Sequence, residues 1–128
     1  MISALTNDIK VSVKTAYQAE FSNPAKDLYI FSYTIRIQNM SNYTVKLLSR
    51  YWDILDAMGF ERTVEGPGVV GEQPELEPNE YFDYSSSCHL STQFGQMSGF
   101  YTFRKNENSE LFEVEIPQFQ LEVPFMLS

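Results

Sequence analysis

Apolar residues at every second position in the first third of the chain set the strongest limit on its fold. Between residues 29 and 37, apolar side chains occupy every odd position: Tyr29, Phe31, Tyr33, Ile35 and Ile37. A period of two places these side chains on one face of a β-strand and the intervening residues on the other. The segment therefore predicts a half-buried strand, and its aromatic residues suit that conformation.

Comparable apolar patterns recur along the chain, separated by clusters rich in Asn, Pro and Gly. No window of eleven or more residues keeps a helical period. We expect further strands at residues 9–17, 45–57, 62–65, 80–86, 98–104 and 111–123. The chain is thus predicted to form one all-β domain over residues 1–128, an antiparallel β-sandwich of the immunoglobulin or fibronectin type III-like class with about seven strands.

Individual residues refine this prediction. In the segment 45–57 we expect Leu48, Trp52 and Ile54 to share one face, with Trp52 buried between two sheets. Pro117 interrupts the last apolar alternation, and the parity of the apolar positions changes after it. Because proline cannot donate to a ladder hydrogen bond, the last strand should be an edge strand or carry a bulge there.

The charge of the chain is unevenly distributed. The net charge is −8, yet residues 1–62 hold six acids and seven bases. Residues 63–103 hold six acids and no base, and residues 104–128 hold five acids and two bases. Nucleic acid and anionic membranes are therefore not expected partners, because the second half would repel them. A basic protein surface or a hydrated cation fits better, and a solvated acidic face is the simplest alternative.

The compartment is predicted to be the cytoplasm. A single cysteine, Cys88, excludes an internal disulfide bond. The N-terminal residues lack the basic flank and continuous apolar run of a signal peptide. No stretch approaches the ~20 apolar residues that a membrane-spanning helix needs.

A glycine-rich segment, Gly66-Pro-Gly-Val-Val-Gly71, has the spacing G-x-G-x-x-G of a nucleotide-binding loop. In such loops the glycines open a helix, whereas here Glu72-Gln-Pro-Glu-Leu-Glu-Pro78 follows and cannot start a long helix. The nearest base in the sequence is Arg62 and there is no P-loop lysine. Two interpretations stay open: a bend that lets the chain cross between sheets, or backbone N–H groups that bind pyrophosphate weakly.

Neither a metal centre nor a catalytic site is predicted. Cys88 and the only histidine, His89, are adjacent, so in a strand their side chains point to opposite faces. The carboxylates between residues 72 and 83 match no EF-hand pattern, which leaves a loose association with Mg²⁺ or Co²⁺ as an alternative. No nucleophile–base arrangement is evident, so we expect no enzyme and no cofactor.

The motifs together resemble the ApaG family. The resemblance rests on Leu47-Leu-Ser-Arg-Tyr-Trp-Asp-Ile54, on the glycine segment through Pro78, and on flanking patterns such as Gly99-x-Tyr101. It implies a fibronectin type III-like sandwich, an association with cobalt and magnesium tolerance, and a role in related eukaryotic proteins as an interaction module. No enzymatic activity is implied. Tyr51 stands where the family usually has histidine, which removes one potential metal ligand.

The leading hypothesis is a non-catalytic module that binds an unknown protein partner through the glycine-rich acidic loop. Its candidate binding residues are Gly66, Gly68, Gly71, Glu72, Gln73 and Pro74. The alternative is direct, weak binding of a divalent metal, pyrophosphate or a nucleotide at the glycine turn. Free edge strands would also allow a homodimer by sheet extension. The apolar C-terminal residues 124–128 are either a partner-binding tail or pack back onto the sheet.

Overall fold

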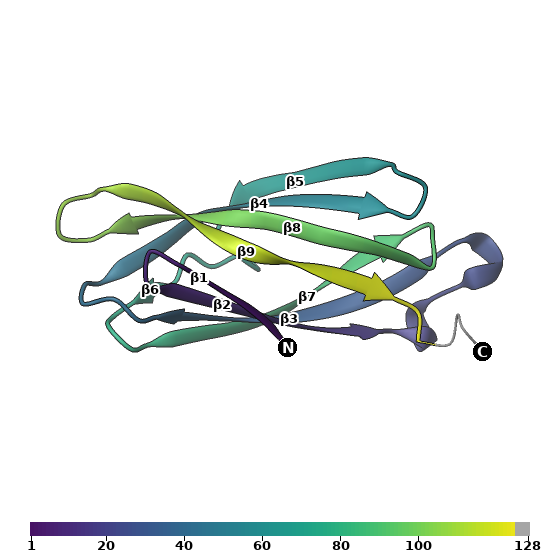
Figure 1. Cartoon of the computed structure of the whole chain (residues 1–128), viewed down its shortest axis with the longest axis horizontal. Helices are drawn as coiled ribbons and strands as arrows, with labels where there is room; N and C mark the ends of the chain where they lie inside the picture. The colour runs from purple at the N-terminus through teal and green to yellow at the C-terminus, as the bar shows by residue number, and fades with distance from the viewer. Residues whose placement is uncertain (125–128) are drawn as a thin grey trace.

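Nine strands pair into two antiparallel sheets in the computed structural model, which describes residues 1–124 (Figure 1). Two short 3₁₀ helices lie between the second and third strands. The elements are β1 (Ile2–Thr6), β2 (Ile9–Tyr17), η1 (Ala19–Phe21), η2 (Pro24–Lys26), β3 (Tyr29–Asn39), β4 (Val45–Asp56), β5 (Glu61–Pro67), β6 (Glu75–Leu76), β7 (Tyr81–Leu90), β8 (Phe94–Lys105) and β9 (Leu111–Glu122).

The first sheet has the order β1-β2-β3-β7, and the second has the order β5-β4-β8-β9 with β6 paired to β4. This arrangement is a fibronectin type III-like sandwich, as the alternation of residues predicted. The strands number nine rather than about seven, because β1 and β6 were not expected. β1 leaves Ile2 and Leu5 largely exposed, and β6 has only two residues, so neither gives a readable apolar pattern.

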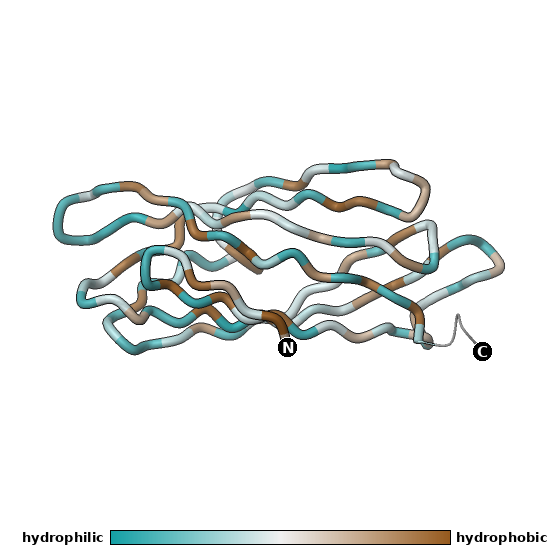
Figure 2. Tube along the Cα trace, in the orientation of Figure 1, coloured by the Kyte–Doolittle hydropathy of each residue, from teal (hydrophilic) through white to brown (hydrophobic). Residues whose placement is uncertain are grey.

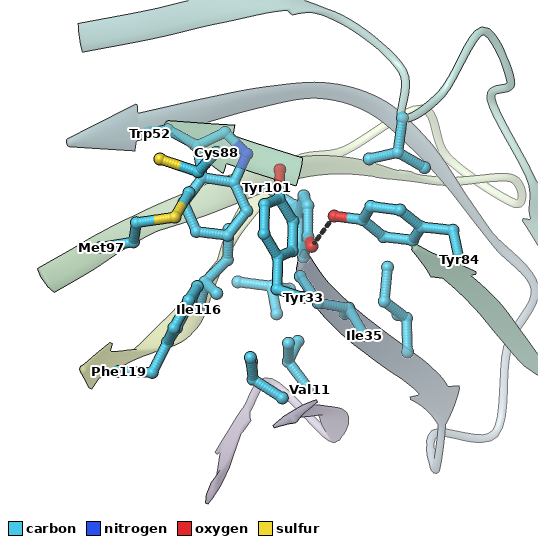
Figure 3. Close-up of a cluster of buried hydrophobic side chains, with 14 of the residues drawn as sticks. Val11, Tyr33, Ile35, Trp52, Tyr84, Cys88, Met97, Tyr101, Ile116 and Phe119 are labelled. Atoms are coloured by element: carbon cyan, nitrogen blue, oxygen red, sulfur yellow. Dashed lines mark hydrogen bonds between the residues drawn. The ribbon is translucent and has the colours of Figure 1, made fainter. Parts of the chain in front are cut away.

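The core lies between the sheets and is built from the alternating apolar positions, which Figure 2 shows as brown and teal bands along the strands. Trp52 is 2% exposed, and its ring lies 5.4 Å from that of Tyr33 on the opposite sheet and 5.8 Å from that of Phe119. The prediction that Trp52 is buried between the sheets is therefore confirmed (Figure 3).

A hydroxyl pair crosses the core. The hydroxyl groups of Tyr84 on β7 and Tyr101 on β8 lie 2.5 Å apart, so that one hydrogen bond joins the two sheets (Figure 3). Both side chains are buried, and burial raises the pKa of each phenol well above its ordinary value. The bond satisfies two polar groups that would otherwise be costly inside an apolar core.

The last strand behaves as Pro117 predicted. β9 is at the edge of its sheet, and its pairing with β8 shifts between Met97↔Phe119 and Gly99↔Ile116. Three residues on β9 therefore span the distance that two span on β8, which is a β-bulge. The bulge explains why the buried positions change from Val114 and Ile116 to odd-numbered residues after it.

One predicted core position was wrong because a second bulge has no marker in the sequence. The pairing of β4 with β8 shifts between Leu47 and Ser49, which places two residues of β4 against one of β8. Leu47 is therefore fully buried, while Leu48 is only half-buried. Trp52 and Ile54 lie beyond the bulge and are buried as expected.

The ends of the chain add two observations. The tail predicted to bind a partner or to pack back lies outside the described residues, except for Pro124. Among residues 1–124, none of the helices has the length and apolar character required to cross a bilayer.

Candidate functional site

The bulge in β4 positions the glycine-rich loop. The carbonyl oxygen of Leu48 accepts a hydrogen bond from the backbone N–H of Gly68 at 2.8 Å. It accepts a second from the side-chain amide of Gln73, also at 2.8 Å. The loop is thus fixed at both ends to one irregular point of a central strand.

Residues 66–74, here called the glycine hairpin, fold back on themselves. Val69 and Glu72 exchange both backbone hydrogen bonds, N–H to O, at 2.8 and 2.9 Å. The two residues between them, Val70 and Gly71, have φ of 43° and 82°. Positive φ at both central positions identifies a type I′ turn, the tight hairpin connection. No helix follows the glycines, as the sequence indicated.

Gly68 and Gly71 adopt backbone conformations that the hairpin requires. Gly68 has φ of 62°, and a Cβ added there would overlap the carbonyl oxygen of Glu72. Gly71 adopts the left-handed conformation at the tip, where the space around it is open. The hairpin backbone uses the N–H groups of Gly68, Val69 and Glu72 for its own hydrogen bonds. Those groups are consequently not free to bind an anion.

Of the six candidate residues, Gln73 and Pro74 hold the hairpin to β4. The Gln73 amide binds Leu48, and the Pro74 carbonyl oxygen accepts a hydrogen bond from the N–H of Leu47 at 3.0 Å. Val70 and Glu72 are exposed to solvent, with Val70 53% exposed, as are Pro67, Gly71 and Gln73. Val69 points the other way and is completely buried.

Arg50, which was not among the candidate residues predicted from the sequence, lies beside the glycine turn. Nη1 of Arg50 donates hydrogen bonds of 3.1 Å to the carbonyl oxygens of both Pro67 and Gly68. A Cβ added at Gly66, opposite Arg50 in the ladder, would lie 3.2 Å from that nitrogen. Arg62 is the base nearest to the glycines in the sequence, but the pairing of β4 with β5 places Arg50 at the turn. A shallow depression of about 320 Å³ adjoins the arginine and the turn.

The acidic segment after the hairpin is ordered by a buried leucine and a tight turn. Leu76 is 4% exposed, and its carbonyl oxygen accepts a hydrogen bond from the buried amide of Asn39. The N–H of Glu80 donates to the carbonyl oxygen of Glu77, and Asn79 has φ of 73°. A positive φ at the third residue is typical of a type II turn.

Side chains alternate between the two faces of β7, both near its start and at Cys88 and His89. Tyr81 is exposed while Tyr84 is buried. Cys88 is buried and His89 is exposed on the opposite face. Arg62 of β5 donates a hydrogen bond of 2.6 Å to the His89 carbonyl oxygen, and burial raises the pKa of the Cys88 thiol. The thiol is therefore protonated and poorly nucleophilic at neutral pH.

The described part of the chain contains no group of three or more His, Cys, Asp or Glu side chains arranged to hold a metal ion. The exposed carboxylates of Glu72, Glu75 and Glu77 lie along one segment and do not converge on a common point. Nothing in this arrangement assigns a chemical step to the glycine hairpin.

The fold and the site are those of a small antiparallel β-sandwich that carries a glycine hairpin fixed to a bulged central strand. A family model described as the ApaG domain matches residues 19–105. Proteins named ApaG from Brucella anthropi and Mesorhizobium japonicum are 50% and 46% identical over 124 residues, covering 97% of this chain and 95% of each relative. The chain belongs to the ApaG family.

A solved structure agrees with the fold. The crystal structure of the putative ApaA protein from Bordetella pertussis is 42% identical in sequence and superposes with a TM-score of 0.89. The match covers 92% of this chain and 95% of that one. The resemblance seen in the sequence motifs is thereby confirmed as family membership.

Proposed function

We propose that the protein is a non-catalytic binding module that contacts a protein partner through the glycine hairpin. Val70 carries this proposal. A β-branched residue at positive φ costs about 1–2 kcal/mol, and Val70 pays it at an exposed hairpin tip with φ of 43°. Backbone strain that the surrounding structure enforces at an exposed site is a mark of function.

The chemistry around Val70 indicates the kind of partner. The hairpin and the segment after it expose the carboxylates of Glu72, Glu75 and Glu77. Arg50 is the nearby base, and its guanidinium is engaged with loop carbonyl oxygens. An apolar tip flanked by acids suits a partner with a small apolar recess surrounded by basic side chains. Any link to cobalt and magnesium tolerance would then act through that partner.

The test exploits opposite effects on stability and binding. Val70→Asn replaces the strained valine with a residue that tolerates the left-handed conformation, so the free energy of unfolding should rise by about 1 kcal/mol. The same change removes the apolar tip, so partner recovery in a quantitative pull-down should fall. Glu72→Lys should also reduce recovery. Leu111→Asn, which removes a similarly exposed apolar side chain from β9, is the matched control.

Partners that Val70→Asn and Glu72→Lys both lose and that Leu111→Asn retains would support the hairpin as the contact surface. Equal recovery by all four proteins would contradict it. Gln73→Ala is not a suitable test, because that amide holds the loop to Leu48 and its loss would disturb the hairpin itself.

A second candidate function is direct binding of pyrophosphate, a nucleotide or a divalent cation at the glycine turn. The observation in its favour is Arg50, whose guanidinium lies at the turn. It predicts calorimetric binding of pyrophosphate, MgCl₂ or CoCl₂ tighter than millimolar, equivalent to about 4 kcal/mol, with the anion lost in Arg50→Gln. Absence of heat with all three probes would remove this candidate and leave the protein-binding proposal untouched.

A further inference from the structure

The outer face of the first sheet carries a groove with a volume of about 420 Å³. Its walls come from β2, β3 and β7, on the sheet that does not hold the glycine hairpin. The polar side chains that line this cationic groove are Lys10, Ser12, Lys14, Thr34, Arg36 and Gln38, with Asp83 beside them.

The charge of the groove is opposite to that of the chain. Lys10, Lys14 and Arg36 project from this face, and Asp83 is the only acid among its lining residues. Three of the nine bases in a protein of net charge −8 therefore gather on one surface. The acidic second half of the sequence predicted that polyanions would be repelled, whereas this face attracts negative charge locally.

Arg36 is held in place for binding. Its Nε and Nη2 donate hydrogen bonds of 2.8 and 2.9 Å to the two carboxylate oxygens of Asp83. Its guanidinium carbon also lies 4.0 Å from the centre of the Tyr81 ring. The paired carboxylate and the aromatic face fix the plane of the guanidinium, while Nη1 stays available to a second acceptor.

The spacing of the cations follows the strand repeat. Lys10, Ser12 and Lys14 are alternate residues of β2, and Arg36 lies directly opposite Ser12 on β3. Alternate residues on one face of a strand are about 6.6 Å apart. Measured along the strand direction, Lys10, Arg36 and Lys14 thus follow one another at steps of about 6.6 Å, with the two lysines on β2 and Arg36 between them on the neighbouring strand. An extended peptide with acidic residues at alternate positions has the same repeat.

The floor between the cations is made of hydroxyl groups. Ser12 is 6% exposed, and its hydroxyl pairs with that of Ser3 at 3.1 Å. Thr34 pairs with Ser85 at 2.9 Å. None of the residues lining the groove is aromatic, and the nearby Tyr81 ring is covered on one face by the Arg36 guanidinium, whose carbon lies 4.0 Å from the ring centre. Proteins that bind single-stranded nucleic acid use aromatic side chains as stacking platforms, so the hydroxyl floor favours a peptide over an oligonucleotide.

We propose that this cationic groove binds an extended acidic segment of a partner protein, with carboxylates at alternate residues aligned on Lys10, Arg36 and Lys14. On binding, the carboxylates of the acidic segment give up water and contact the two lysine ammonium groups and the Arg36 guanidinium. Binding is therefore salt-sensitive and depends on the spacing of the acids. The glycine hairpin is on the other sheet, and this proposal is independent of its role.

The test measures fluorescence anisotropy with the full chain and a labelled eight-residue peptide of alternating glutamate and serine. We expect saturable binding at low salt, and at least tenfold weaker binding to a peptide with the four glutamates in one block. Lys10→Glu/Lys14→Glu should lose binding at least tenfold. Lys26→Glu/Lys46→Glu gives the same change in net charge away from the groove, and it should bind as the original protein does.

Equal losses in the two double variants would show that only net charge matters and would overturn the proposal. Tighter binding of an eight-nucleotide oligothymidine, or of inorganic pyrophosphate, would assign the groove to phosphate ligands instead and also overturn it. Failure to detect binding at peptide concentrations up to millimolar would also overturn the proposal. If the charge reversal prevents folding, Lys10→Gln/Lys14→Gln provides the comparison, with circular dichroism to verify the fold.

Discussion

The two outer faces of the sandwich differ in charge although one chain builds both. The first sheet projects three bases and one acid from its strands, including the cationic groove. The second projects two bases, Lys46 and Arg104, from one end of its face. Across the rest of that face, six acids project outward: Asp53, Glu61, Glu65, Glu113, Glu115 and Glu122.

The net charge of a small domain is therefore a poor guide to the charge of any one of its surfaces. On the acidic face the rings of Tyr51 and Phe100 stack with centroids 5.1 Å apart, and desolvation raises the pKa of Tyr51, with a further contribution from the nearby carboxylates. The cationic face has hydroxyl groups in the corresponding central region. A sandwich of this kind can present two surfaces that select partners of opposite charge.

The strands of the two sheets also differ in glycine content. The strands of the first sheet contain no glycine, whereas those of the second contain Gly66, Gly95 and Gly99. Gly99→Ala should therefore damage the acidic face most, because the added Cβ would overlap the carbonyl oxygen of Tyr51. We expect a loss of about 3 kcal/mol or more in the free energy of unfolding, measured with urea.

Gly59→Ala is the matched control for that change. Gly59 has φ of 88° but no atom within 4 Å of an added Cβ, so only the backbone penalty of about 1 kcal/mol applies. Equal losses in the two variants would mean that close packing of β4 against β8 is not what Gly99 provides.

The tyrosine pair that joins the two sheets gives the next effect. Tyr84→Phe leaves the buried hydroxyl of Tyr101 without its partner and should cost about 1–3 kcal/mol at pH 7. The double change Tyr84→Phe/Tyr101→Phe removes both polar groups and should recover part of that loss. Urea unfolding of the original protein, Tyr84→Phe, Tyr101→Phe and the double variant measures the coupling between the residues.

The same pair predicts a pH dependence. Burial raises the pKa of both phenols, so the folded state favours their protonated form. The resulting stability is fully present below the unfolded pKa of about 10 and is lost as the pH rises above it. Stability measured from pH 8 to 11 should fall less steeply in the double phenylalanine variant. Identical slopes would show that these two phenols do not cause the alkaline loss.

The smallest effect is expected when two charged side chains are neutralised on one outer face of the sandwich or on the other. At low salt, Glu113→Gln/Glu115→Gln should raise the free energy of unfolding by about 0.3 kcal/mol, because it relieves repulsion in an acidic protein. Lys10→Gln/Lys14→Gln should lower it by a similar amount. Thermal unfolding at 20 mM and 500 mM salt measures both, and the differences should vanish at high salt. Changes of the same sign would contradict a charge-based origin.

Much of the fold could be predicted because alternation reports local geometry directly. Tyr29 to Ile37 gave a strand with its buried face, and Pro117 marked a bulge since proline has no N–H to donate. The bulge at Leu48 was missed because no special residue accompanies it. Its consequences were missed too: the anchoring of Gln73 and the position of Arg50 both depend on how β4 pairs with its neighbours.

Closure of the glycine hairpin at Val69 and Glu72 makes its tip an insertion point. The two backbone hydrogen bonds complete the ladder before the turn begins, so the fold already holds both ends of the turn in place. Lengthening a closed loop costs little, because the loop entropy rises only with the logarithm of its length. A short epitope inserted between Val70 and Gly71 should therefore leave the sandwich folded.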